Sequence, residues 1–262
     1  MIRARLRRRP ALEPTIEVRD RGGLRWLHIG GEAIQSAMRI AEPAALVLDY
    51  TRAMMAFLLF HPEPRQALMI GLGGGSLAKF FHRHLRRTRS RVVELDARVI
   101  EAARRDFSLP ADDARLQVAA GDGAEALAPE CCDLLIVDGY EDERHVPRLA
   151  TQEFYDACFL ALAGPGVLVV NFMDDDPALD RQLQRLERAF GGALVAFHAP
   201  RDPNVIALAL KGFPARVEWQ ALQRRARSLE ARYGLPFSAL LPRLRHMNRS
   251  SPQALLLAAA EA

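Results

Sequence analysis

Hydrophobic and polar residues alternate along this chain in blocks that predict strands and helices in turn. Residues 15–29 alternate around a Gly-Gly turn, which is the pattern of a β-hairpin. The apolar runs at 67–70 and 133–137 are continuous, as is typical of parallel strands covered on both faces. Between these runs, apolar residues of segment 76–85 recur at helical spacing.

The rest of the chain continues this alternation of strand and helix. A mostly buried helix is expected from Pro43, placed at its first turn, to Phe60. Further elements are expected in this order: a strand ending at Glu94, helix 97–107, strand 114–119, strand 133–137, helix 151–162 capped by Thr151, strand 167–172, helix 177–190, and a closing strand pair at 194–198 and 205–210. The order favours an α/β fold with a doubly wound sheet.

Three segments are expected from these patterns. Residues 1–42 form a basic N-terminal tail and a small β element, and residues 43–212 form the α/β domain. Residues 213–262 form an Arg-rich helical C-terminal extension. We find no internal repeat.

A glycine-rich turn joins the strand at 67–70 to the following helix. Gly71, Gly73 and Gly75 lack a Cβ atom, so this turn can adopt positive φ and let a ligand lie against the backbone. Glu94 ends the next strand about twenty residues on, where Rossmann-like folds place the acid that binds ribose hydroxyls. The pattern therefore predicts a nucleoside site, and with it a Rossmann-like nucleoside-binding catalytic domain over residues 43–212, although such glycines also mark tight turns.

Acidic residues also follow the next two expected strands. Asp122, flanked by Gly121 and Gly123, follows one strand, and Asp138 follows the strand at 133–137. Ligands of doubly wound sheets bind beyond the carboxyl ends of the strands. We therefore expect the glycine turn and these acids to converge on one site.

The net charge of +4 hides an uneven distribution. Residues 1–9 carry five Arg and no acid, and residues 213–262 carry eight Arg and three acids. Of the 36 basic and 32 acidic residues, 23 and 29 remain between the ends, a net charge of −6. An acidic body suits a cationic substrate, and basic ends remote from the glycine turn do not favour a nucleic-acid partner.

Composition also limits the compartment and the chemistry. Cys131, Cys132 and Cys158 have no metal-ligand spacing, and their odd number argues against a disulfide framework, so we expect a reducing cytoplasm and no metal site. The basic opening has no apolar segment of the kind that follows in a secretory signal. The longest apolar run, Ala53 to Phe60, is too short to span a bilayer, so no membrane association is expected.

Several segments resemble the spermidine synthases, the polyamine aminopropyltransferases, which share the class I S-adenosylmethionine methyltransferase fold. The similarity holds in order and spacing over roughly residues 24–175. The segments that carry it are HPEPRQALMIGLGGG, VVELD followed by ARVIEAARRDF, DDARLQVAAGDGAEAL, CCDLLIVDGYED and TQEFYDACFLALAGPGVLVVNF.

The resemblance implies roles for particular residues. Glu94 would bind the ribose hydroxyls, and Asp122 with the adjoining Gly123 the adenine, of decarboxylated S-adenosylmethionine. Asp138 matches the general base that removes a proton from the attacking amine. Gln35 resembles a glutamine beside the nucleoside, and Tyr50 a tyrosine over the aminopropyl and amine groups. Each has a plainer alternative, since Gln35 could cap an element and Tyr50 could belong to the core.

Two positions depart from the family pattern. The glycine loop of the family reads GGGDGG, but this chain has Gly74 in place of the Asp that holds the amine end of the aminopropyl chain. The second Asp of the D-x-x-D-P segment is Glu141 here, and no Pro follows. Without a carboxylate at position 74, the site is expected to repel the carboxylate of ordinary S-adenosylmethionine less.

Three functions are consistent with these residues. The first is a spermidine synthase-like enzyme that transfers an aminopropyl group to an amine such as putrescine, with no prosthetic group and as a homodimer. Asp138, Glu141 and Tyr50 would then be catalytic. The second is a methyltransferase that uses S-adenosylmethionine itself. The third is a non-catalytic nucleoside-binding protein whose basic tails contact partners or nucleic acid.

Overall fold

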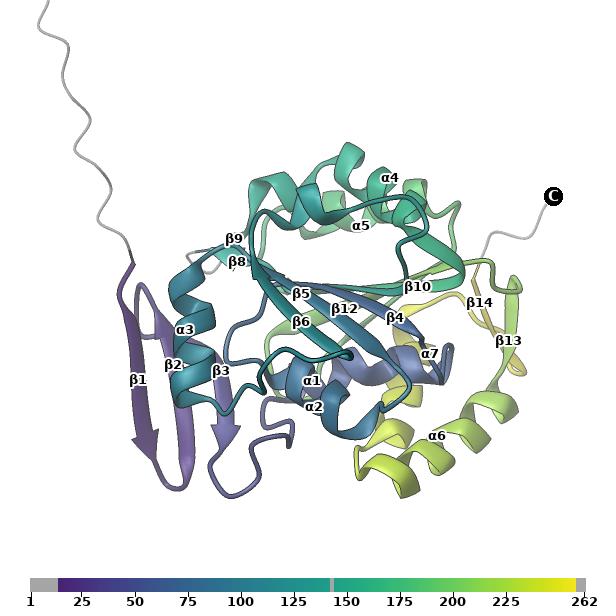
Figure 1. Ribbon diagram of the computed structural model, residues 1–262. Helices are drawn as coiled ribbons and strands as arrows, with labels where there is room; N and C mark the ends of the chain where they lie inside the picture. Colours follow the sequence, from purple (N-terminus) through teal and green to yellow (C-terminus); the bar gives the residue numbers. More distant parts are fainter. Residues whose placement is uncertain (1–13, 142–143, 258–262) are drawn as a thin grey trace, which may run out of the picture.

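A computed structural model describes residues 14–141 and 144–257 of the chain, drawn as a ribbon in Figure 1. The basic segment 1–9 and the acids Asp142 and Glu143 lie outside the described residues.

A seven-stranded sheet forms the centre of the molecule, in the order β11-β12-β10-β7-β4-β5-β6. The five strands from β10 to β6 pair in parallel, and β12 is antiparallel to both β10 and β11. This topology confirms the expected doubly wound α/β sheet. The strands are β4 (Gln66–Ile70), β5 (Arg89–Glu94), β6 (Leu116–Ala120), β7 (Cys132–Val137), β10 (Leu162–Met173), β11 (Leu194–His198) and β12 (Asn204–Lys211).

Helices cover both faces of this sheet, as Figure 1 shows. On one face lie α4 (Gln152–Ala161) and α5 (Leu179–Ala189). The other face carries α1 (Asp49–Met54) with the 3-10 helix η1 (Met55–Leu59), α2 (Ser76–His84), α3 (Ala97–Asp106), α6 (Trp219–Tyr233) and α7 (Leu241–Met247). Within β4, Ala67 and Met69 pack into one core layer and Leu68 and Ile70 into the other. Burial on both faces explains why this strand reads as a continuous apolar run.

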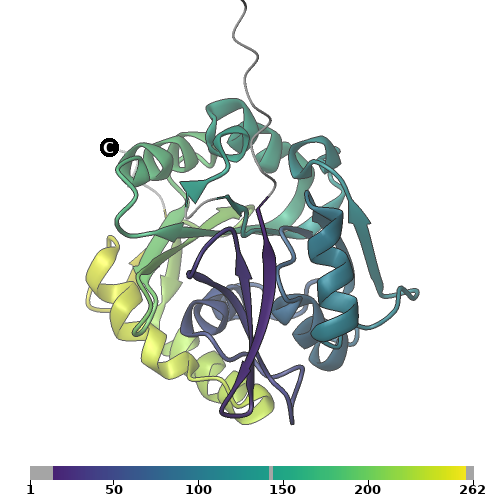
Figure 2. The ribbon, with the colours of Figure 1, turned by 90° about the vertical axis from the view of Figure 1, so that its left-hand side faces the viewer.

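A separate three-stranded antiparallel sheet contains β1 (Ile16–Arg21), β2 (Leu24–Ile29) and β3 (Ile34–Arg39). Figure 2 shows it facing the viewer, in front of the main sheet. Leu27 and Met38 form a small core with Phe107, the residue that follows α3. The β1–β2 hairpin was predicted from the sequence, and the third strand was not.

Short elements complete the chain. The 3-10 helices are η2 (Gly123–Ala126), η3 (Pro147–Ala150) and η4 (Phe237–Leu240). Two small strand pairs join β8 (Tyr140–Glu141) to β9 (Arg144–His145) and β13 (Arg216–Glu218) to β14 (Ala254–Leu256). The Arg-rich tail contains the expected helices, and the domain boundaries at 42/43 and 212/213 stay predictions.

The helix expected from Pro43 was wrong in its first part. Helix α1 begins at Asp49, preceded by Leu48 in extended conformation. The side chain of Asp202, which lies 152 residues away, accepts a hydrogen bond from the backbone N–H of Tyr50 at 2.8 Å. This remote carboxylate satisfies one of the free donors of the first turn, so the helix begins there.

The strand expected at 167–172 was too short. Strand β10 begins at Leu162 and pairs with β7 at both Leu162 and Val167, with a register shift between them. The predicted cap of α4 is confirmed, since the Thr151 hydroxyl accepts a hydrogen bond from the N–H of Phe154 at 3.1 Å.

A buried lysine ties α2 to the end of α3. Lys79 is only 3% exposed, and its Nζ donates a hydrogen bond to the backbone oxygen of Phe107 at 2.8 Å. The same Nζ lies 5.8 Å from the centroid of the Phe107 ring. Burial lowers the pKa of Lys79 to about 7.

We predict that Lys79 makes stability rise with pH. Between pH 7 and 9 the unfolded lysine, with a pKa of about 10.4, holds a proton that the folded lysine loses. The free energy of unfolding should therefore increase by about 2 kcal/mol more in the wild type than in Lys79→Met. Urea unfolding at both pH values measures this difference, and an equal increase in the two proteins would contradict it.

Candidate active site

The carboxyl ends of four adjacent parallel strands bring the predicted site residues to one edge of the sheet. Gly71 follows β4, Glu94 ends β5, Asp122 follows β6 and Asp138 follows β7. Backbone hydrogen bonds of 2.9 Å run from Asp138 N–H to the oxygen of Ile70, and from Gly71 N–H to the oxygen of Val93. A third such bond joins Gly121 to Glu94. The expected convergence is therefore present.

The glycine turn requires two kinds of freedom at Gly71. Its φ is +97°, and a Cβ at this position would overlap the backbone oxygen of Asp138. Only glycine allows the ends of β4 and β7 to approach this closely. Gly73 and Gly75 also have positive φ, and Gly75 is the N-cap residue of α2. The turn thus presents bare backbone directly beside Asp138.

Gly74 is needed for a different reason. A Cβ at this position would lie 2.7 Å from Ser36 Oγ and 2.8 Å from Phe107 Cδ1. Ser36 belongs to β3 of the small sheet and is buried, and its hydroxyl lies 3.3 Å from that of Ser76. The small sheet therefore fills the space that an aspartate at position 74 would need, which gives a physical reason for the departure from GGGDGG.

Glu94 is fixed by the same turn. Its Oε2 accepts a hydrogen bond from the N–H of Leu72 at 2.8 Å, and its Oε1 accepts one from the N–H of Asp96 at 3.1 Å. The carboxylate is partly buried. These two bonds hold it between the glycine turn and the start of α3, and its binding of ribose hydroxyls stays a prediction.

Asp122 caps η2 and is paired with an arginine that the sequence did not single out. Its Oδ1 accepts a hydrogen bond from the N–H of Ala124 at 2.9 Å, and its Oδ2 forms an ion pair with Arg148 of η3. The Arg148 side chain is 66% exposed, so this pair is weak and a ligand can compete for the carboxylate. A Cβ at Gly123 would overlap the Ile70 side chain, so η2 packs tightly over β4.

Asp138 has the most perturbed carboxyl group of the site. Its Oδ1 accepts a hydrogen bond from Asn171 Nδ2 at 2.8 Å. Burial raises the pKa of Asp138 to about 6. Hydrogen bonds from Asn171 and Tyr50 oppose this rise, and the carboxylate of Glu94 adds to it. At neutral pH the group is therefore mostly ionised but still basic enough to take a proton.

Tyr50 joins α1 to two other parts of the site. Its side chain hydrogen-bonds to Asp138, and its hydroxyl lies 3.5 Å from the backbone oxygen of Gln35 on β3. The Gln35 oxygen is also 3.8 Å from the position that a Cβ on Gly73 would take. The structure therefore brings Gln35, Tyr50, Asp138 and the glycine turn together.

Glu141 forms part of β8, but its side chain lies outside what the structure describes, so its catalytic role stays a prediction.

Asn171 and Asn204 were not singled out by the sequence analysis. A polar amide inside the apolar run VLVVNF was the available signal for Asn171.

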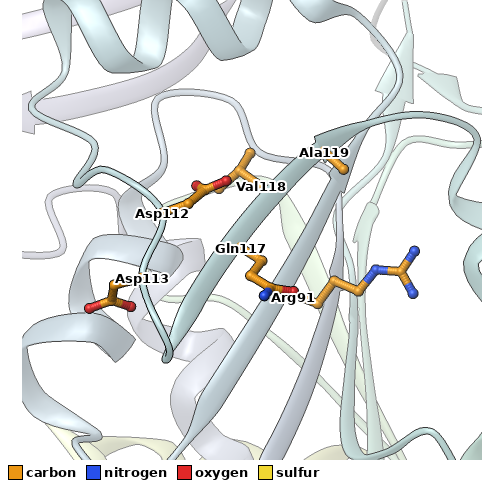
Figure 3. A pocket seen from close by; sticks show the side chains of 6 residues that line it. All are labelled: Arg91, Asp112, Asp113, Gln117, Val118 and Ala119. Atoms are coloured by element: carbon orange, nitrogen blue, oxygen red, sulfur yellow. The ribbon is translucent and has the colours of Figure 1, made fainter.

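Two cavities lie apart from this set. One of about 420 Å³ is lined by Arg91, Asp112, Asp113, Gln117, Val118 and Ala119, along β5 and β6 and the segment before β6 (Figure 3). Another of about 280 Å³ lies between α1, the turn at 200–201 and η4. Neither cavity is lined by a predicted site residue. The candidate active site is therefore assigned from the residues at the strand ends.

Within residues 14–141 and 144–257, no group of three or more His, Cys, Asp or Glu residues could hold a metal ion. No helix in the same residues has the length and apolar character needed to cross a membrane.

Comparisons with known proteins point to one family. The family model described as spermine/spermidine synthase domain matches residues 48–192. A polyamine aminopropyltransferase of Chromobacterium violaceum is 37% identical over 97% of this chain and 98% of its own length. One of Neisseria meningitidis is 34% identical over 92% of this chain and 94% of its own.

A solved spermidine synthase in complex with the transition-state analogue AdoDATO superposes with a TM-score of 0.66. It is 22% identical and covers 90% of this chain and 87% of its own. At this identity the likeness shows the fold alone.

We predict that Gly74→Ala destabilises the protein. The new methyl group would overlap Ser36 and Phe107, and overpacking of this kind costs about 1–3 kcal/mol. Gly121→Ala is the matched control, because its Cβ would meet only Val93, at 3.7 Å. Thermal unfolding of both variants should show a loss only in Gly74→Ala. Equal behaviour of the two would mean that the space beside Gly74 is not filled.

Proposed function

The chain belongs to the spermine/spermidine synthase family and is a polyamine aminopropyltransferase-like enzyme, and we propose that Asp138 is its general base. The reaction moves an aminopropyl group from decarboxylated S-adenosylmethionine to an amine such as putrescine. The observation that carries the proposal is a partly buried carboxyl group with a pKa of about 6, placed beside the glycine turn.

The chemistry needs a base at this position. The nitrogen lone pair of the amine attacks the carbon next to the sulfonium, so a C–N bond forms while the C–S bond breaks. The bonding electrons stay on sulfur, and methylthioadenosine leaves. The attacking nitrogen must lose a proton, and Asp138 accepts it. Holding both substrates in line supplies much of the remaining rate.

The other residues have supporting roles in this proposal. The backbone of Gly71, Gly73 and Gly75 lies along the nucleoside, and Glu94 accepts hydrogen bonds from the ribose hydroxyls. Asp122, with Gly123, binds the adenine amino group by displacing Arg148. Two more residues complete the site: Tyr50 borders the aminopropyl and amine groups and Gln35 lies beside the nucleoside, as their placement near Asp138 and the glycine turn supports.

We also propose a homodimer in the cytoplasm that needs no prosthetic group. Free cysteines support the compartment: Cys132 and Cys158 are buried and Cys131 is exposed, and none forms a disulfide within residues 14–141 and 144–257.

We predict that Asp138→Asn lowers the release of methylthioadenosine by about 10²–10⁴-fold, the usual contribution of a general base. In the wild type, kcat should fall as pH drops below about 6, because protonated Asp138 cannot accept a proton. Purified protein with both substrates and a pH series measures both effects. If the wild type released methylthioadenosine no faster than Asp138→Asn does, this role for Asp138 would be ruled out.

The identity of the donor follows from a second experiment. A methyltransferase that uses intact S-adenosylmethionine is the alternative that Gly74 favours, because the Ser36 and Ser76 hydroxyls near it carry no charge. We expect calorimetric titration to give tighter binding of the decarboxylated donor. Tighter binding of intact S-adenosylmethionine, with methyl transfer, would support the methyltransferase. Binding without turnover of either would support a nucleoside-binding protein.

A further inference from the structure

Two asparagines are buried where the central sheet turns antiparallel. Asn171 lies near the end of β10 and Asn204 begins β12, and they are only 3% and 6% exposed. Their strands pair so that Met173 lies opposite Asn204 and Asn171 opposite Ile206. A buried amide among apolar residues is costly unless its polar atoms are hydrogen-bonded.

The two side chains form a directed chain of hydrogen bonds that ends on Asp138. Asn204 Nδ2 donates to Asn171 Oδ1 at 2.9 Å, and Asn171 Nδ2 donates to Asp138 Oδ1 at 2.8 Å. An ionised carboxylate can only accept, so Asn171 must turn its NH₂ group toward Asp138 and its oxygen away. Asn204 then supplies the donor that this oxygen needs.

We propose that Asn171 and Asn204 are positioning residues that fix the orientation of the Asp138 carboxylate and keep it ionised for proton transfer. The inference rests on the proposed role of Asp138. Asn171 holds one carboxylate oxygen by a donor that cannot turn away without losing its own bond to Asn204.

The residues just before Asn204 also contact α1 on the other side of the site. Asp202, two residues before Asn204, accepts a hydrogen bond from the backbone of Tyr50. Arg201 forms an ion pair with Asp49 at 2.6 Å. Segment 201–204 is therefore tied to both Tyr50 and Asp138.

The charged surroundings of Asp138 set the sign of the effect. Among described residues, the titratable groups that face it are Glu94 from β5, which raises its pKa, and Tyr50 from α1, which lowers it by hydrogen bonding. The hydrogen bond from Asn171 also lowers it. Without that donor the pKa should rise, and a larger share of the carboxyl groups would be protonated at neutral pH.

The test measures the pKa of Asp138 directly, by carbon NMR of the full-length protein with ¹³C-labelled aspartate and Asp138→Asn to assign the signal. In Asn171→Leu the pKa should rise by about one pH unit or more, the size expected for loss of a hydrogen bond to a charged group. Asn204→Leu should raise it less. Asn171→Ser keeps a hydrogen-bond donor, so the pKa of Asp138 should rise less in this variant than in Asn171→Leu. The Ser variant replaces Asn171→Leu in the test if the Leu variant does not fold.

The matched control is Gln182→Leu. Gln182 is another buried amide, 2% exposed, but it bonds to Tyr155 and Asp176. It should leave the pKa of Asp138 unchanged. An unchanged pKa in Asn171→Leu, or an equal shift in Gln182→Leu, would overturn the proposal.

The acid limb of kcat should move with the pKa in each variant. If the wild type releases no methylthioadenosine, the proposed function fails, whereas the NMR shift still reports whether the amide chain acts on Asp138.

Discussion

The close approach of two strand ends determines the rest of the site. At Gly71 the backbone after β4 passes so near the Asp138 oxygen that a side chain cannot fit. This approach places the glycine turn, the start of α2 and the proposed base within one small region. Backbone hydrogen bonds from Gly71 to Val93 and from Asp138 to Ile70 extend β4 and β7 by one residue past their ends. Glu94 belongs to the same arrangement, because its carboxylate is held by the N–H of Leu72 in the turn.

The site is built at a cost in stability. The pKa of Asp138 is higher in the folded protein than in the unfolded chain. The free energy of unfolding therefore decreases as pH rises from the unfolded pKa to the folded pKa of about 6. Asn171 and Tyr50 reduce this penalty by hydrogen bonding without removing it. A base with a raised pKa is useful for proton transfer near neutral pH, so a group that is unfavourable for folding is suited to the reaction.

Sequence patterns predicted the features that depend on local order. The strand ends at Glu94 and Asp138 follow from apolar runs, and the parallel topology then brings them together. The start of α1 was not predictable, because the carboxylate that accepts a hydrogen bond from its first turn, Asp202, comes from a segment far along the chain. The need for glycine at position 74 was not predictable either, because Ser36, which fills the space beside it, belongs to another sheet. Likewise, Arg148 and Asn204 act through contacts that spacing does not reveal.

We propose that the strand ends direct a bound amine toward Asp138. A crystal structure of the protein with methylthioadenosine and putrescine would test this arrangement. We expect the adenosine to lie along Gly71–Gly75 with its ribose on Glu94, and a putrescine nitrogen to lie within hydrogen-bonding distance of the Asp138 carboxylate. A nucleoside in this position with the amine bound elsewhere, and Asp138 contacting only protein groups, would contradict it.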